Sequence, residues 1–124
     1  MVIAAPLTPQ TEGLFDQKAF KAMKNSARLI NIGRGPIVKT DDLISALDNG
    51  EIAGAGLDVF EEEPVPEDHP LWDYENVTMS AHMAGDFIGW KHALTDQFLE
   101  NFDLWQQGKD RFNLVDKKLG YAKK

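Results

Sequence analysis

Short apolar runs alternate with helical segments along most of this chain, and that alternation restricts the fold more than any other feature. The runs predict strands at residues 2–6, 27–33, 53–60 and 76–82, and the spacing between them predicts helices at 16–25, 41–49 and 87–107. Strands that alternate with helices through short connections favour a mostly parallel sheet with flanking helices. We therefore predict an α/β chain, half of a doubly wound parallel sheet that ends in a long amphipathic helix.

Local signals mark where the predicted helices begin and end. Asp16 and Thr40 are candidate N-caps, because their side-chain oxygens can accept hydrogen bonds from free N–H groups of the first turn. Gly50 is a candidate C-terminal stop. An apolar stripe recurs at helical spacing in the last helix, and we expect it to pack on the core: Trp90, Leu94, Phe98, Phe102 and Trp105.

Composition excludes several classes of partner. The 124 residues carry a formal net charge of -7, with no basic stripe to meet the phosphates of a nucleic acid or an anionic membrane surface. The chain has no cysteine, which excludes disulfides and thiolate metal sites and is compatible with the cytoplasm. His69 and His92 lack metal-ligand spacing to carboxylates. We expect no metal site, a structural role for His69 and an exposed position for His92.

The segment "LINIGRGPIV", residues 29–38, places an arginine between two glycines at the end of an apolar run. Leu29, Ile30 and Ile32 suit a strand with both faces buried, and the glycines on either side of Arg34 allow a sharp turn after it. Loops at strand ends present the chemistry of α/β sheets, which suggests that Arg34 binds an anion. The alternative from these ten residues alone is a surface arginine on an ordinary turn.

Polar groups follow three of the predicted strands and are expected to meet at one edge of the sheet. Arg34 follows the second strand, the acidic run 61–63 the third, and His82 ends the fourth. A guanidinium offers a planar fork for a carboxylate, and an imidazole exchanges protons near neutral pH. Together with a carboxylate, these groups suit polar catalysis on a small anionic substrate. The alternative is three unrelated polar residues at loop starts.

Several segments in order, "LINIGRGPIVKTDDLISALDNGEIAGAGLDVFEEEP", "HPLW" and "NVTMSAHMAG", resemble the D-isomer-specific 2-hydroxyacid dehydrogenases. The resemblance implies a Rossmann-like fold and the interconversion of 2-oxo and D-2-hydroxy acids. By position, Arg34 is similar to the arginine that binds the substrate carboxylate. Glu63, directly before the proline, and His82 are similar to the carboxylate and the acid–base histidine, which leaves Glu61 and Glu62 as solvated neighbours.

The same resemblance implies NAD as cofactor, with NADP not excluded. Asp58 is similar to the residue that accepts a hydrogen bond from the nicotinamide carboxamide. The other implied cofactor contacts lie in the loop after the first strand, at the end of the second strand and just after His82: Pro6, Leu7, Thr8, Ile32, Gly33, Ala84 and Gly85.

The chain also departs from the family pattern. No G-x-G-x-x-G turn for the cofactor pyrophosphate is present, so residues 1–107 are expected to be the C-terminal half of a cofactor domain. Residues 108–124 resemble the return to a substrate domain. Ala81 stands where the family usually has proline, which relaxes the backbone before His82.

These departures lead to expectations about activity and assembly. We expect negligible turnover by the isolated chain, and self-association as a homodimer or higher assembly, since the first strand has an uncovered edge. The alternative function is a non-enzymatic dimerisation or binding module, or a remnant, on the same fold.

Overall fold

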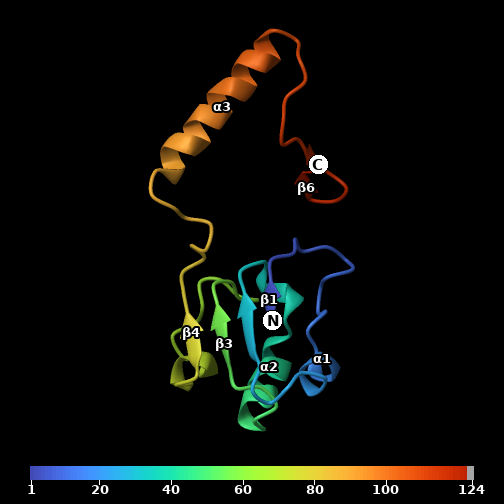
Figure 1. Ribbon diagram of the computed structural model, residues 1–124, viewed down its shortest axis with the longest axis vertical. Helices are drawn as coiled ribbons and strands as arrows, with labels where there is room; N and C mark the ends of the chain where they lie inside the picture. The colour runs from blue at the N-terminus through green and yellow to red at the C-terminus, as the bar shows by residue number, and fades with distance from the viewer. Residues whose placement is uncertain (123–124) are drawn as a thin grey trace. The chain divides into compact units, whose positions relative to one another are not determined.

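The computed structural model describes residues 1–122, which fall into two compact units, Met1–Ala84 and a second unit that begins at Gly85 (Figure 1). The first unit holds a parallel sheet and two α-helices. Its elements in chain order are β1 (Val2–Ile3), α1 (Gln17–Lys21), β2 (Arg28–Asn31), the 3-10 helix η1 (Gly35–Ile37), α2 (Thr40–Asp48), β3 (Gly54–Leu57), the 3-10 helix η2 (Pro70–Asp73) and β4 (Val77–Met79).

The four strands form one sheet in the order β1-β2-β3-β4, and every neighbouring pair is parallel, as predicted (Figure 1). All four strands are shorter than the apolar runs that predict them. The hydrogen-bonded ladder ends where each strand leads into a loop. Since the strands are parallel, their carboxyl ends lie at the same edge of the sheet. β1 is an edge strand.

One face of the sheet carries the core, to which both α1 and α2 contribute side chains. The largest fully buried side chains are Phe20, Leu29, Ile37, Leu43, Ile52, Leu71 and Asn31. The prediction that β2 is buried on both faces is wrong, because Ile30 and Ile32 are 41% and 42% exposed. Ile30 and Ile32 therefore lie on a face of the sheet that the described residues do not cover.

Two of the predicted helix-end signals are confirmed. Asp16 is the N-cap of α1, and its Oδ1 accepts hydrogen bonds from the N–H groups of Lys18 and Ala19 at 3.0 Å each. At the end of α2, the N–H of Gly50 donates to the carbonyl of Leu47 at 3.1 Å. These bonds satisfy backbone groups that the ends of a helix otherwise leave unpaired.

Thr40 is not the N-cap of α2, contrary to the prediction. It is the first residue of the helix, and its own N–H donates to the Oε2 atom of Glu61 at 2.7 Å. A carboxylate at this position also interacts favourably with the positive end of the helix dipole. The expectation that Glu61 is only a solvated neighbour is therefore incomplete, since this exposed side chain ties the loop after β3 to the start of α2.

The second unit contains α3 (Trp90–Gln106) and a two-stranded antiparallel ladder of β5 (Val115–Asp116) and β6 (Tyr121–Ala122). No residue of α3 is buried, so the prediction that its apolar stripe packs on a core is wrong for the structure described. Two short strands provide no core for a helix to cover. Instead the stripe pairs with itself, with Phe98 and Phe102 rings 6.3 Å apart and Phe102 and Trp105 rings 5.7 Å apart.

The predicted division into domains at residue 107 stays a prediction. Among the residues that the structure describes, no helix has the length and apolar character needed to cross a bilayer.

Candidate active site

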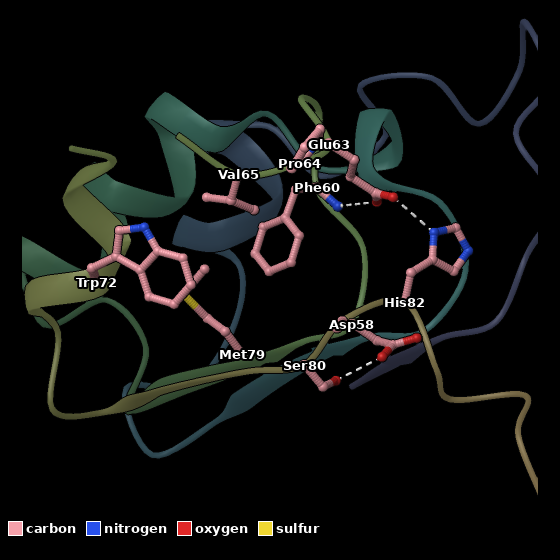
Figure 2. Close-up of a pocket in the computed structure, with 10 residues that line it drawn as sticks. Asp58, Phe60, Glu63, Pro64, Val65, Trp72, Met79, Ser80 and His82 are labelled. Atoms are coloured by element: carbon pink, nitrogen blue, oxygen red, sulfur yellow. Dashed lines mark hydrogen bonds and ion pairs between the residues drawn. The ribbon is translucent and has the colours of Figure 1, made fainter. Parts of the chain in front are cut away.

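The carboxyl edge of the sheet gathers the polar residues that follow β2, β3 and β4. Asp58 comes directly after β3 and Ser80 directly after β4, and their backbone N–H groups continue the ladder to Asn31 and Leu57, at 3.0 and 2.9 Å. Arg34 follows β2 after a short turn. The order of the parallel strands therefore determines which side chains can meet here, as Figure 2 shows for the β3 and β4 ends.

Glu63 and His82 are in direct contact, with 2.8 Å between Glu63 Oε2 and His82 Nδ1 (Figure 2). The other carboxylate oxygen, Oε1, accepts a hydrogen bond from the N–H of Phe60 at 2.9 Å, which fixes the orientation of Glu63. Both side chains remain open to solvent, at 48% exposure for His82 and 35% for Glu63. The second ring nitrogen, Nε2, points away from Glu63 and is free to face a substrate.

The ionised form of Glu63 is favoured by this arrangement. The hydrogen bond with His82, followed by the one from the Phe60 N–H, holds the pKa of Glu63 below its ordinary value of 4.5. A carboxylate beside Nδ1 fixes the orientation of the ring and leaves Nε2 on the side away from Glu63.

Asp58 binds one side-chain group before His82 and two backbone groups after it. Its Oδ1 accepts hydrogen bonds from the Ser80 hydroxyl at 2.6 Å and from the Met83 N–H at 2.8 Å, and its Oδ2 accepts from the Ala84 N–H at 2.8 Å. Asp58 is only 4% exposed. Desolvation by burial, the largest single influence, raises the pKa of Asp58, but the three hydrogen bonds outweigh it and leave the pKa below its ordinary value of 3.8.

Arg34 is exposed and has an extended backbone, with φ at -145°. Its guanidinium donates to the carbonyl of Gly33 at 2.7 Å. Within residues 1–122 no acidic side chain forms an ion pair with it, so its charge is available to an external anion. The structure thus brings Glu63 and His82 into contact and places Arg34 at the same edge, following β2.

The glycines on either side of Arg34 are required for close packing of the backbone. The chain does turn here, with a bend at Gly33 and η1 beginning at Gly35, but neither glycine has a positive φ, so the turn itself does not require glycine. A Cβ atom on Gly35 would lie 1.8 Å from the carbonyl oxygen of Phe60, and one on Gly33 would lie 2.7 Å from the carbonyl oxygen of Ala5. Gly35 thereby lets the Arg34 loop approach the loop that carries Glu63.

Asn31, the last residue of β2, is a site residue that sequence reasoning misses. Its side chain is 1% exposed, accepts a hydrogen bond from the Gly33 N–H at 3.1 Å and donates one to the Arg34 carbonyl at 3.1 Å. A buried polar residue is usually hydrogen-bonded, so an asparagine inside the apolar run "LINIG" is the signal that could have identified it.

We expect Asn31→Asp to destabilise the first unit by about 1 to 3 kcal/mol. The aspartate still accepts from Gly33, but it cannot donate to the Arg34 carbonyl, and it buries a charge. Asn25→Asp is the matched control, because Asn25 also donates to a carbonyl, that of Gly50 at 2.8 Å, but is exposed to water. Urea unfolding measures both; an equal, small effect for the two variants would contradict the role of Asn31.

A cavity of about 620 Å³ lies next to Glu63 and His82. Its polar side is formed by Asp58, Ser80 and His82 together with Glu63, and its apolar lining includes Phe60, Pro64, Val65, Trp72, Met79 and Ala81 (Figure 2). Arg34 is not among the lining residues. The cavity therefore lies beside Glu63 and His82 and is not the common pocket of all three groups.

The residues expected to contact a cofactor lie at the ends of β1 and β2 or after His82. Pro6 and Leu7 are exposed, while Thr8 is tied into its loop by hydrogen bonds with Thr11. Ile32 is also exposed, whereas the neighbouring Gly33 is buried and packs closely against the backbone of Ala5. An exposed apolar side chain such as that of Ile32 can pack on the face of a flat aromatic ring. Gly85, the first residue of the second unit, stays a prediction.

The remaining histidines have ordinary positions. His69 accepts a hydrogen bond from the Leu71 N–H at 3.2 Å and so caps η2, which confirms its predicted structural role. His92 is exposed on α3. No group of three or more metal-binding side chains is found in the described part of the chain.

The four-stranded parallel sheet with flanking helices, and with Glu63 and His82 in contact at its carboxyl edge, is a Rossmann-like arrangement. Residues 1–84 match the family described as "D-isomer specific 2-hydroxyacid dehydrogenase, NAD binding domain", and the chain belongs to this family. NAD binding is thus the function of the matched domain.

Relatives and solved structures agree with this family. A glyoxylate/hydroxypyruvate reductase A of Yersinia enterocolitica is 38% identical over 94% of the chain and 36% of its own length. A D-isomer specific 2-hydroxyacid dehydrogenase of Xanthobacter autotrophicus, solved with NADPH and MES, is 41% identical, with a TM-score of 0.85 over 97% of the chain and 49% of its own. An NADPH-dependent glyoxylate/hydroxypyruvate reductase of Sinorhizobium meliloti, solved with NADP and sulfate, is 33% identical, with a TM-score of 0.89 over 97% of the chain and 39% of its own. The chain spans less than half the length of each of these relatives.

Proposed function

We propose that this chain is the part of an NAD(P)-dependent dehydrogenase that carries its acid–base chemistry, for the interconversion of 2-oxo acids and D-2-hydroxy acids. The observation that carries the proposal is the 2.8 Å contact between Glu63 and His82 at the carboxyl edge of a parallel sheet. The names of the glyoxylate and hydroxypyruvate reductases support a small 2-oxo acid as substrate.

Three side chains divide the chemistry among them. The Arg34 fork binds the substrate carboxylate through paired N–H groups and places the adjacent carbonyl toward His82. His82 donates the proton on Nε2 to the carbonyl oxygen as that oxygen gains negative charge, and Glu63 holds the ring in place through Nδ1. A bound reduced nicotinamide supplies the hydride that the carbonyl carbon receives. In the reverse direction His82 takes the hydroxyl proton.

Exposed apolar side chains support the proposed position of the nicotinamide. Leu7 and Ile32 offer an apolar surface for a flat ring near the ends of β1 and β2. NADPH and NADP in the two solved relatives support either dinucleotide as the cofactor. No G-x-G-x-x-G turn occurs in the 124 residues, so we propose that the isolated chain has negligible turnover, because a misplacement near 1 Å can cost on the order of 100-fold.

Exposed apolar side chains in each unit support self-association of this chain, and we propose a homodimer. In the first unit Ile30 and Ile32 are exposed, and in the second unit Phe98 on α3 is 65% exposed. Exposed apolar surface can mark a protein interface. The composition, with no cysteine, supports a cytoplasmic location.

Binding of oxamate, an unreactive analogue of a small 2-oxo acid, tests the proposal in the presence of NADH. We expect Arg34→Ala to weaken oxamate binding by about 10- to 100-fold, since a hydrogen bond to a charged group is worth about 1.5 to 3 kcal/mol. Arg34→Lys should recover little, because an ammonium lacks the planar fork. NMR titration measures all three proteins.

Arg28→Ala is the matched control, since Arg28 is also exposed but begins β2, at the opposite edge of the sheet. Equal losses for Arg28→Ala and Arg34→Ala would show that net charge alone attracts the anion, and would contradict the proposed site.

A further inference from the structure

The hydroxyl of Ser80 is hydrogen-bonded to Asp58. The residue is exposed, yet its Oγ donates to Asp58 Oδ1 at 2.6 Å, a short distance typical of a hydroxyl bound to a carboxylate (Figure 2). Ser80 follows β4 directly, and its N–H is bound to the Leu57 carbonyl, so the position of its backbone is fixed by the sheet. The hydroxyl is therefore a rigid donor.

The Asp58 carboxylate connects Ser80 to the backbone on the far side of His82. Oδ1 is shared by Ser80 and Met83, and Oδ2 is bound to the N–H of Ala84. The carboxylate torsion of an aspartate has a broad energy profile, so the side chain alone does not define which way its oxygens face. The hydrogen bond from Ser80 to Oδ1 fixes the rotation of the Asp58 carboxylate group, and thereby directs Oδ2 toward the N–H of Ala84.

His82 itself has a backbone conformation that needs support. Its φ is +54°, in the left-handed region that non-glycine residues seldom adopt, at a cost of about 1 to 2 kcal/mol. Ala81 leaves the preceding φ unrestricted, whereas a proline would fix it. Hydrogen bonds on both sides of His82 must then hold the turn, and the Asp58 carboxylate provides them.

We propose that Ser80 is a positioning residue: by orienting the Asp58 carboxylate it holds the left-handed turn at His82, and so keeps the imidazole on Glu63. This inference rests on the proposed function in that it gives Ser80 a part in acid–base catalysis. It also gives Asp58 a task within the protein, the support of residues 80–84, in addition to its predicted contact with a nicotinamide. Two of its oxygen–backbone bonds would weaken together if the hydroxyl were lost.

Amide hydrogen exchange and the His82 Nδ1 resonance, both measured by NMR on the full chain, test this proposal without any need for turnover. In Ser80→Ala we expect exchange at Met83 and Ala84 to accelerate by about tenfold or more. The Nδ1 resonance of His82 should move toward that of an imidazole without a carboxylate partner. Exchange in the interior of β2, at Ile30, should stay as in the unmodified chain.

Two variants sharpen the test. Ser80→Thr keeps a hydroxyl at the same atom and should restore both readouts. Thr78→Ala removes an exposed hydroxyl two residues earlier on β4 and should change neither. Unchanged exchange at Met83 and Ala84 in Ser80→Ala would overturn the proposal, as would equal acceleration at Ile30 or a failure of Ser80→Thr to restore the His82 signal.

Failure of this proposal can be separated from failure of the proposed function. Arg34→Ala should weaken oxamate binding by about 10- to 100-fold and leave the exchange rates and the His82 resonance unchanged. Ser80→Ala should change those two readouts whether or not oxamate binds.

Discussion

Gly35→Ala is expected to destabilise the first unit by about 3 kcal/mol, at the upper end for overpacking. The added methyl group would lie 1.8 Å from the carbonyl oxygen and 1.9 Å from the carbonyl carbon of Phe60. These are backbone atoms, so no side-chain rotation relieves the clash, and one of the two loops must shift. Because the Phe60 N–H holds Glu63, the shift should also separate Glu63 from His82.

Thermal unfolding followed by circular dichroism measures the effect, which corresponds to about 4 to 8 °C for each kcal/mol in a unit of this size. Gly85→Ala is the matched control, since a Cβ on Gly85 meets nothing within 4 Å and its φ is not positive. If the two variants unfolded at the same temperature, the close approach of the Arg34 and Glu63 loops would be contradicted.

Asp58→Asn is expected to have a comparable cost, and a dependence on pH that identifies its cause. The amide has one accepting oxygen where the carboxylate has two, so its NH₂ group must face either the Ala84 N–H or the Ser80 and Met83 donors. Loss of one hydrogen bond to a charged group costs about 1.5 to 3 kcal/mol. If the NH₂ group faces the Ser80 and Met83 donors, the repulsion between donors increases this cost.

The pH dependence follows from the lowered pKa of Asp58. A carboxylate whose pKa is lower in the folded than in the unfolded chain stabilises the fold fully above the ordinary value, 3.8, and loses that contribution as the pH falls through the lowered value. The difference in unfolding free energy between the natural chain and Asp58→Asn should therefore be constant near neutral pH and shrink below about pH 4. Glu63 and Asp16, whose pKa values are also lowered, are present in both proteins and largely cancel.

Urea unfolding between pH 7 and pH 2.5 measures this difference. Asp68→Asn, which alters an exposed acid in the loop after β3, is the control and should change stability by less than about 0.5 kcal/mol. A difference for Asp58→Asn that stayed constant down to the lowest pH would show that its carboxylate does not stabilise the folded chain.

The sequence predicts the parts of the site that depend on strand order. Parallel strands bring their carboxyl ends to one edge, so the segments that carry Glu63 and His82 are expected to approach each other, and the structure places the two side chains in contact. Asp16 and Gly50 are predicted for a similar reason, since helix ends leave backbone groups unpaired in a fixed pattern. Such rules depend only on residue type and local spacing, and both can be determined directly from the sequence.

The parts that sequence reasoning misses depend on contacts between distant loops. The roles of Asn31 and of Glu61 at the start of α2 follow from where turns bring their side chains, which local spacing does not specify. Gly35 is required by the backbone of Phe60, a residue of another loop, and its own conformation gives no sign of this. An apolar stripe likewise predicts that α3 packs on a core, but it does not reveal that the unit containing α3 has no core to pack on.

The central claim is that Arg34, Glu63 and His82 act on one small 2-oxo acid. A crystal structure of the chain grown with NADH and oxamate tests it most directly. We predict one oxamate with its carboxylate on the Arg34 guanidinium and its carbonyl oxygen about 3 Å from His82 Nε2, while Nδ1 stays on Glu63. Oxamate bound to Arg34 but out of reach of His82, or bound only elsewhere, would contradict the account.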